Sequence, residues 1–216
     1  MSFAKPKVIL AAGAFRSGST WLYNAIRLIL LAGGAKVSSG WVDDIRLDST
    51  RQSDYLLVKI HEPSDSWRVR AWRIFTSHRD LRDVARSSSD FLKIQDTDGL
   101  LKCAETAMSH HAYWAEHAHC DVPYELIESG ADRLLQDIVL SLGIEIATID
   151  ILAIRNELES MQEPVNAASY DSTSLLHPVH RFGGRSGDWA KRLTPEQAEL
   201  IARKYQAWMR TYGYIL

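Results

Sequence analysis

A glycine-bounded loop between a short apolar run and a helix-forming segment constrains the fold of this chain most strongly. The apolar run covers Val8 to Ala12, the loop covers Gly13 to Gly18, and a mostly apolar segment from Ser19 to Leu31 follows. This order predicts a strand, a loop with the spacing G-x-x-x-x-G, and a helix. Backbone N–H groups and the helix dipole bind phosphate-like anions in such a setting. A plain glycine turn has the same pattern, so the loop alone does not decide the function.

The rest of the chain alternates strand-like and helix-like segments. Apolar runs at Tyr55 to Ile60 and Ala71 to Thr76 predict two more strands, and a short run from Asp121 to Tyr124 follows later. The expected helices cover Leu81 to Phe91, Gly99 to His119 (capped by Thr97 or Asp98), Ala131 to Leu142, Thr148 to Leu158, and Thr194 to about Thr211. Alternation of this kind predicts an α/β fold, with a central, mostly parallel sheet flanked by helices.

Composition places limits on the partners and the compartment. The 216 residues are 46% hydrophobic, which suits one domain over residues 1–216, and the net charge of −2 gives no reason to expect nucleic acid. Cys103 and Cys120 show no metal or redox spacing, and the N-terminus leads directly into the first strand. The most apolar segment, Leu22 to Gly34, is shorter than the roughly 20 residues of a membrane span. We therefore expect a cytoplasmic protein without a membrane span.

The cation of the loop is in an unusual place. A nucleoside triphosphatase carries lysine directly after the second glycine, where this chain has Ser19, and the cation here is Arg16 within the loop. The segment Phe15 to Trp21 resembles the phosphosulfate loop of the sulfotransferases that use 3′-phosphoadenosine 5′-phosphosulfate (PAPS). The resemblance implies that Arg16 and the amides after it hold the 5′-phosphosulfate and that Trp21 lies near the adenine. The residues with those amides are Ser17, Gly18, Ser19 and Thr20.

A lysine and a histidine stand at the end of the second predicted strand. Alternation along a strand places Lys59 and His61 on the same side. In isolation such a histidine is more often structural. The pattern Lys-x-His-x-Pro, however, resembles the catalytic segment of the same family. By this resemblance His61 removes the proton of the acceptor hydroxyl, and Lys59 stabilises charge near the bridging oxygen.

The third predicted strand ends at an arginine and leads into a helix. Arg79 and Ser87 are eight residues apart within a segment that resembles the family's 3′-phosphate motif, Arg-x-x-Arg/Lys-Asp-Val-x-x-Ser. The guanidinium and the hydroxyl suit a phosphate monoester. The other charged residues, Arg82, Asp83 and Arg86, fit a solvated helix start, and we leave them out of the predicted site.

Two further segments match the family in part. Val122 to Ile127 resembles its Tyr-Glu-Asp segment, which makes Tyr124 an adenine contact, although Leu126 replaces the aspartate and a core tyrosine explains the residue equally well. The segment from Phe182 resembles the family's C-terminal glycine loop, whose backbone approaches the 3′-phosphate at Gly184. Phe182-Gly183 replaces the family's Arg-Lys, so Arg181 or Arg185 would supply the charge, with Arg185 slightly preferred because it lies within the loop.

The motifs occur in the family's order and together predict a PAPS-dependent sulfotransferase with a P-loop-type, three-layer fold. The reaction would give adenosine 3′,5′-bisphosphate (PAP) and a sulfated small-molecule or glycan acceptor, with no metal. Four histidines suggest a metal site but lack the spacing of one: His110, His111, His117 and His119. The alternatives are a P-loop small-molecule kinase and a noncatalytic nucleotide-binding module. The acceptor and the oligomeric state stay open.

Overall fold

The structure, a computed structural model, describes residues 5–50, 52–161, 171–177 and 185–216. Its centre is a five-stranded sheet in the order β2-β3-β1-β4-β5, and every neighbouring pair of strands is parallel. The strands are β1 (Lys7–Ala11), β2 (Val37–Trp41), β3 (Tyr55–Lys59), β4 (Ala71–His78) and β5 (Cys120–Pro123). This arrangement confirms the predicted α/β class.

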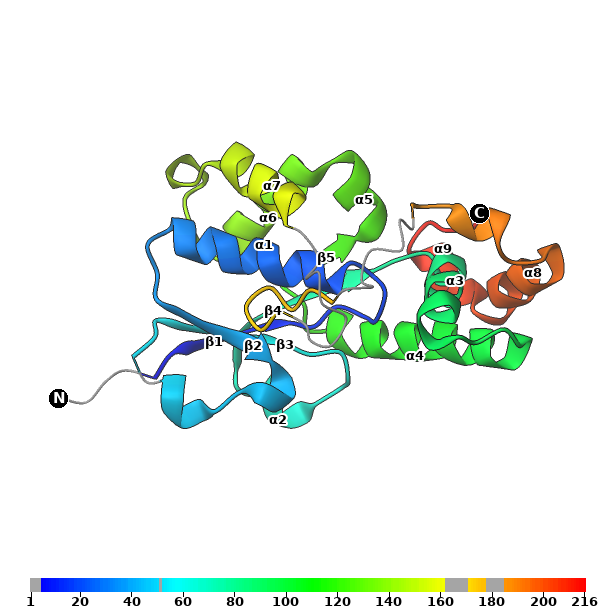
Figure 1. Cartoon of the computed structure of the whole chain (residues 1–216), viewed down its shortest axis with the longest axis horizontal. Helices are drawn as coiled ribbons and strands as arrows, with labels where there is room; N and C mark the ends of the chain where they lie inside the picture. Colours follow the sequence, from blue (N-terminus) through cyan, green and yellow to red (C-terminus); the bar gives the residue numbers. More distant parts are fainter. Residues whose placement is uncertain (1–4, 51, 162–170, 178–184) are drawn as a thin grey trace.

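Helices cover both faces of the sheet, as Figure 1 shows. One face is covered by α1 (Ser19–Ala32), α6 (Ala131–Ser141) and α7 (Ile151–Ser160), and α4 (Thr97–Ala115) packs on the other. The remaining helices are α2 (Asp65–Arg68), α3 (Leu81–Leu92), α5 (Tyr124–Ser129), α8 (Pro195–Lys204) and α9 (Gln206–Thr211).

The sequence of β1 explains why this strand lies in the middle of the molecule. Ile9 and Ala11 pack into the core beneath α1, whereas Leu10 and Ala12 pack into the opposite core, which includes Trp114 of α4. A strand that is buried on both faces reads as a continuous apolar run rather than an alternating one. In a parallel sheet all carboxyl ends share one edge, and the loops after β1, β3, β4 and β5 therefore meet there.

Most of the predicted elements are confirmed, with four corrections. The strand β2 was not predicted, because Val37–Trp41 contains two serines and a glycine and lacks an apolar run. Asp96, not Thr97 or Asp98, caps α4 by accepting a hydrogen bond from the Gly99 amide. Tyr124 begins α5 directly after β5. The predicted C-terminal helix is interrupted at Tyr205, although its capping box at Thr194 is present.

None of the helices among the described residues combines the length and the apolar character that a membrane span requires.

Candidate active site

The loop after β1 has a strained backbone that suits anion binding. Arg16 has a φ of 63° and Gly18 a φ of 84°, so two of three successive positions lie in the left-handed region. That conformation costs a non-glycine residue about 1–2 kcal/mol, and it is concentrated at functional sites. There is no room for a side chain at Gly13, because a methyl group there would lie 2.2 Å from the Ser77 hydroxyl oxygen. The loop is therefore packed tightly against the end of β4.

The predicted residues of the loop lie in two different environments. Ser17 is buried beneath the loop, where its hydroxyl donates to the Ala14 carbonyl at 2.6 Å. Gly18, Ser19, Thr20 and Trp21 line a cavity at the start of α1. The first turn of a helix carries N–H groups without a partner within the helix, and this end of α1 therefore faces the cavity with donors and a positive dipole.

Lys59 lies under the first turn of α1. Its side chain is 3% exposed, and its ammonium donates to the Thr20 hydroxyl at 2.5 Å. Burial, and secondarily the charge of Arg16, lowers the pKa of Lys59 to about 7. Near pH 7 such a lysine is only partly charged, and an anion beside it would favour the charged form.

His61 is held in one tautomer by the loop. Its Nδ1 lies 2.6 Å from the Gly13 carbonyl oxygen, and because a carbonyl only accepts, Nδ1 must carry the proton. The Nε2 atom therefore has the lone pair that a general base needs. Burial, reinforced by the charge of Lys59, lowers the pKa of His61 to about 3, so the ring is neutral near pH 7. Phe15 and Trp41 meet the ring edge-on.

Arg79 and Ser87 lie at the same end of the cavity, as predicted. The Arg79 guanidinium stacks on the Tyr124 ring at 3.8 Å, and burial raises the pKa of Tyr124 although Arg79 opposes the rise. Arg16 Nε donates to the Ser87 hydroxyl at 2.8 Å. Arg16 therefore links the loop to the predicted 3′-phosphate residues instead of facing the predicted 5′ site alone.

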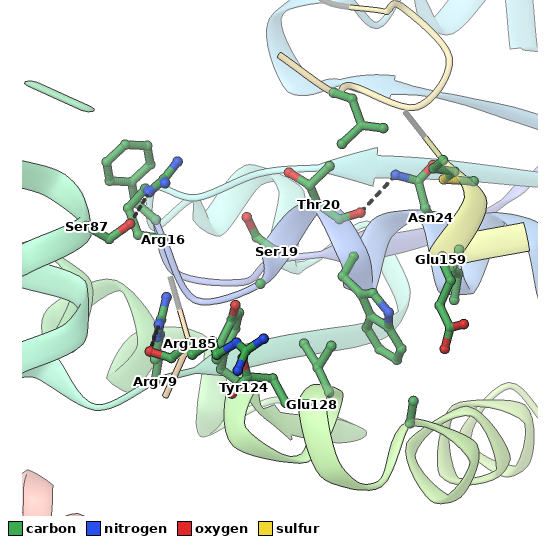
Figure 2. A pocket seen from close by; sticks show the side chains of 18 of the residues that line it. Arg16, Ser19, Thr20, Asn24, Arg79, Ser87, Tyr124, Glu128, Glu159 and Arg185 are labelled. Carbon is green, nitrogen blue, oxygen red and sulfur yellow. Dashed lines mark hydrogen bonds between the residues drawn. The ribbon is translucent and has the colours of Figure 1, made fainter. Parts of the chain in front are cut away.

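One cavity of about 510 Å³ connects these groups. Figure 2 shows Arg16, Ser87 and Arg79 at one end, and Asn24 and Glu159 at the other. The lining also includes a set of apolar side chains: Trp21, Ile127, Ala131, Leu158, Met161 and Leu176. His61 also lines the cavity. A ligand that fits has anionic groups at one end and a flat, apolar part at the other, as a nucleotide does.

Asp83 is part of the site, contrary to our expectation of a solvated helix start. It is fully buried, and its carboxylate accepts from the amides of Gly187 and Trp189 at 2.8 and 2.9 Å. This fixes the end of the glycine loop, and Arg185 in that loop lines the cavity while its carbonyl accepts from Arg79. Gly184 and Arg181, the other loop predictions, lie outside the described residues.

Arg82 and Arg86 are not solvated either. Arg82 pairs with Asp80 at 2.6 Å and stacks on Trp189 at 4.1 Å, and Arg86 is buried. The error arose because charged residues near a helix start usually face water, and the glycine loop that covers this face is distant in sequence.

A second polar cluster lies behind the end of β4. Asp121 accepts from His78 Nδ1 at 2.9 Å and from His111 Nε2 at 3.1 Å. Burial opposes ionisation of Asp121, but the two imidazoles hold its pKa well below the usual range. Trp208 donates to His111 Nδ1, so His111 Nε2 carries a proton and offers no lone pair to a metal. We interpret the cluster as a structural network that fixes the strand end before Arg79.

Comparison with known proteins supports the fold. No protein-family model matches the sequence, and no curated protein sequence matches it. Among solved structures, retinol dehydratase in complex with androsterone and the inactive cofactor PAP matches with a TM-score of 0.65. The chain shares the fold of retinol dehydratase. The match covers 96% of this chain and 83% of retinol dehydratase at 14% sequence identity. Retinol dehydratase in a complex with retinol and PAP matches at a TM-score of 0.64 and 13% identity, over 95% and 82% of the two chains.

Proposed function

We propose that this protein is a sulfotransferase that moves the sulfuryl group of PAPS to a hydroxyl of a small-molecule or glycan acceptor. One observation carries the proposal: a single cavity joins the anion-binding loop, the Arg79–Ser87 pair and the base-competent His61. PAPS has two separate anionic groups on one adenosine, and the cavity offers two places for them. The structures of retinol dehydratase with PAP support the same choice of nucleotide.

Each residue has a defined part in the proposed reaction. His61 Nε2 accepts the proton of the acceptor hydroxyl while that oxygen forms a bond to sulfur, and the bond from sulfur to the 5′-phosphate oxygen breaks. Lys59, Arg16 and the amides of Gly18 to Thr20 stabilise the charge that develops on the leaving phosphate, whereas the Ser17 amide already donates to the Ala14 carbonyl. Neutral His61 suits this part, because a protonated ring would have no lone pair. These steps need positioning and electrostatics, and none of them uses a metal.

The nucleotide would lie along the cavity. Arg79 and Ser87 would bind the 3′-phosphate, with Gly184 and Arg185 of the glycine loop beside them. Trp21 and Tyr124, the latter beside Arg79, would contact the adenine. The stack of Arg79 on Tyr124 supports this arrangement, since it fixes the cation beside an aromatic face.

The alternatives receive less support from the site. A kinase would need a cation beside the transferred phosphoryl group from the position of Ser19, and the cation of this loop is Arg16 instead. A noncatalytic module has no use for a buried lysine and a histidine in a fixed tautomer beside the loop. A cytoplasmic location, one domain over residues 1–216 and an acceptor of natural-product or carbohydrate type remain part of the proposal.

The test is turnover of PAPS in the presence of an acceptor panel of phenols, steroids and sugars, with PAP formation measured by chromatography. The expected result is metal-independent PAP formation that His61→Asn lowers about 10²–10⁴-fold, with PAP affinity unchanged. His117→Asn, an exposed histidine on the segment after α4, is the matched control. Transfer from ATP with Mg²⁺ in place of PAPS would show that the protein is a kinase.

A further inference from the structure

Arg86 is a buried cation whose hydrogen bonds are incomplete. Its side chain is about 5% exposed, and Nη2 forms an ion pair with Asp90 at 3.1 Å. Nε and Nη1 are fully buried and have no hydrogen-bond partner among the described residues. Unsatisfied donors on a buried charge are rare in native proteins, because they lose water without gaining a partner. Such a group is expected where a ligand supplies the missing acceptors.

Arg86 lies on α3 next to the anionic end of the cavity, although its own side chain is not among the lining residues. Asp83 lies three residues earlier on α3 and holds the glycine loop, and Ser87, the next residue, lines the cavity. Residues three and four apart share a helix face, so Arg86 lies on the side of α3 that meets this loop. Its charge reaches both neighbours: burial and Arg79, followed by Arg86, lower the pKa of Arg16, and Arg86 adds a small contribution to the lowered pKa of Asp188, which comes mainly from the hydrogen bond of Lys191.

Arg82, the other arginine of α3, has the hydrogen-bond partners that are typical of a structural arginine. Arg82 donates to both oxygens of Asp80 and to the Tyr214 carbonyl, and its guanidinium stacks on Trp189. Arg82 therefore has acceptors within the fold. Arg86 has one carboxylate on the same helix, and two of its nitrogen atoms have no acceptor among the described residues.

We propose that Arg86 is a further anion-binding residue of the nucleotide site, which contacts the 3′-phosphate together with Arg79 and Ser87. This inference rests on the proposed function. A phosphate monoester dianion suits the place, because it brings two charges and three acceptor oxygens to buried guanidinium groups. The Ser87 hydroxyl oxygen accepts from Arg16 Nε, and a 3′-phosphate would accept from the Ser87 O–H and from Nε and Nη1 of Arg86.

The proposal makes an unusual prediction about stability. Removal of one partner of a buried ion pair destabilises a protein, but Asp90, the partner of Arg86, is 27% exposed and can be solvated, and the loss of buried donors without acceptors offsets the cost. Arg86→Met keeps the length of the side chain and removes those donors. We expect the ligand-free variant to unfold at the temperature of wild type or above it, and to lose most of the thermal shift that PAP produces.

The experiment is calorimetric titration of PAP and of AMP, which lacks the 3′-phosphate, into wild type, Arg86→Met and Arg86→Lys. Arg70→Met is the control, since Arg70 is exposed and precedes β4 at the opposite edge of the sheet. We expect Arg86→Met to weaken PAP binding about 10–100-fold, with AMP affinity within about twofold of wild type. Arg86→Lys keeps the charge, and its PAP affinity is expected to lie between those of wild type and Arg86→Met.

The outcomes separate this inference from the proposed function. Wild type that binds PAP tightly while Arg86→Met binds it equally well would overturn the role of Arg86 and leave the sulfotransferase proposal standing. Equal losses of PAP and AMP affinity, or a ligand-free Arg86→Met that unfolds at a lower temperature with normal PAP affinity, would show that Arg86 is structural. Wild type without measurable PAP binding would contradict both.

Discussion

Nucleotide binding is expected to take up a proton at Lys59. Burial lowers the pKa of this residue to about 7 in the ligand-free protein. Such a lysine is half protonated at pH 7 and about 1% protonated at pH 9. If the 5′-phosphate binds only the charged form, the apparent Kd of PAP rises as the protonated fraction falls, by about 50-fold between pH 7 and pH 9. Titration of the phosphates, near pH 6, and of Arg16, near pH 10, adds little within this range.

The assay is calorimetric titration of PAP at pH 8 in two buffers that differ in their heat of ionisation. At that pH about 0.9 proton should be taken up for each PAP bound, because about 90% of Lys59 is neutral beforehand. Lys59→Met should take up none and should bind PAP weakly at every pH. Lys102→Met, which removes an exposed lysine of α4, serves as the control and should behave as wild type.

The lowered pKa of Lys59 also determines how the stability of the ligand-free protein changes with pH. Because the pKa of Lys59 is below its ordinary value of 10.5, the unfolded chain binds more protons between pH 7 and that value. Lys59 therefore makes the ligand-free protein more stable as pH rises through this window, and Lys59→Met should remove that contribution. A wild-type Kd that stays constant from pH 7 to pH 9, without proton uptake, would refute the reasoning.

Two further predictions concern the backbone around the site. Gly18→Ala should lower the free energy of unfolding by about 1–3 kcal/mol and weaken PAP binding, because the φ of Gly18 is +84° and a methyl group would lie 2.7 Å from Ile127. Urea unfolding measures the stability, and an unchanged value would contradict the prediction. Asp83→Ala should weaken binding of PAP far more than that of AMP, because the amides of Gly187 and Trp189 lose their acceptor. Equal effects on the two nucleotides would show that Asp83 only supports the fold.

The sequence predicts the interior of the sheet well and its edge poorly. β1, β3 and β4 are buried apolar runs, and burial on both faces leaves a clear signal in composition. The edge strand β2 contains serines and a glycine and is defined by pairing with β3, which no local pattern shows. The break at Tyr205 also comes from tertiary packing, as its hydroxyl donates to the Leu101 carbonyl.

The residues of the candidate site also differ in how well the sequence predicts them. The loop, Lys59, His61 and Arg79 are recognisable because they lie at or directly after strand ends at the same edge of the sheet, and Ser87 because it lies on the helix that follows β4. The role of Asp83 cannot be recognised in the sequence, because it depends on hydrogen bonds from a loop about one hundred residues later. The role proposed for Arg86 cannot be recognised either, because it depends on buried nitrogen atoms that have no acceptor among the described residues. The tautomer of His61 likewise needs the Gly13 carbonyl at 2.6 Å, a distance that no sequence pattern gives.

The most direct test of the central claim is calorimetric titration of PAP and AMP, without added metal, into wild type and Arg79→Ala. The account predicts that wild type binds PAP much more tightly than AMP. Arg79→Ala should weaken PAP binding about 10–100-fold and change AMP binding little, since a buried arginine then no longer meets the 3′-phosphate. Equal affinities of wild type for PAP and AMP, or a preference for ATP with Mg²⁺, would contradict the sulfotransferase assignment.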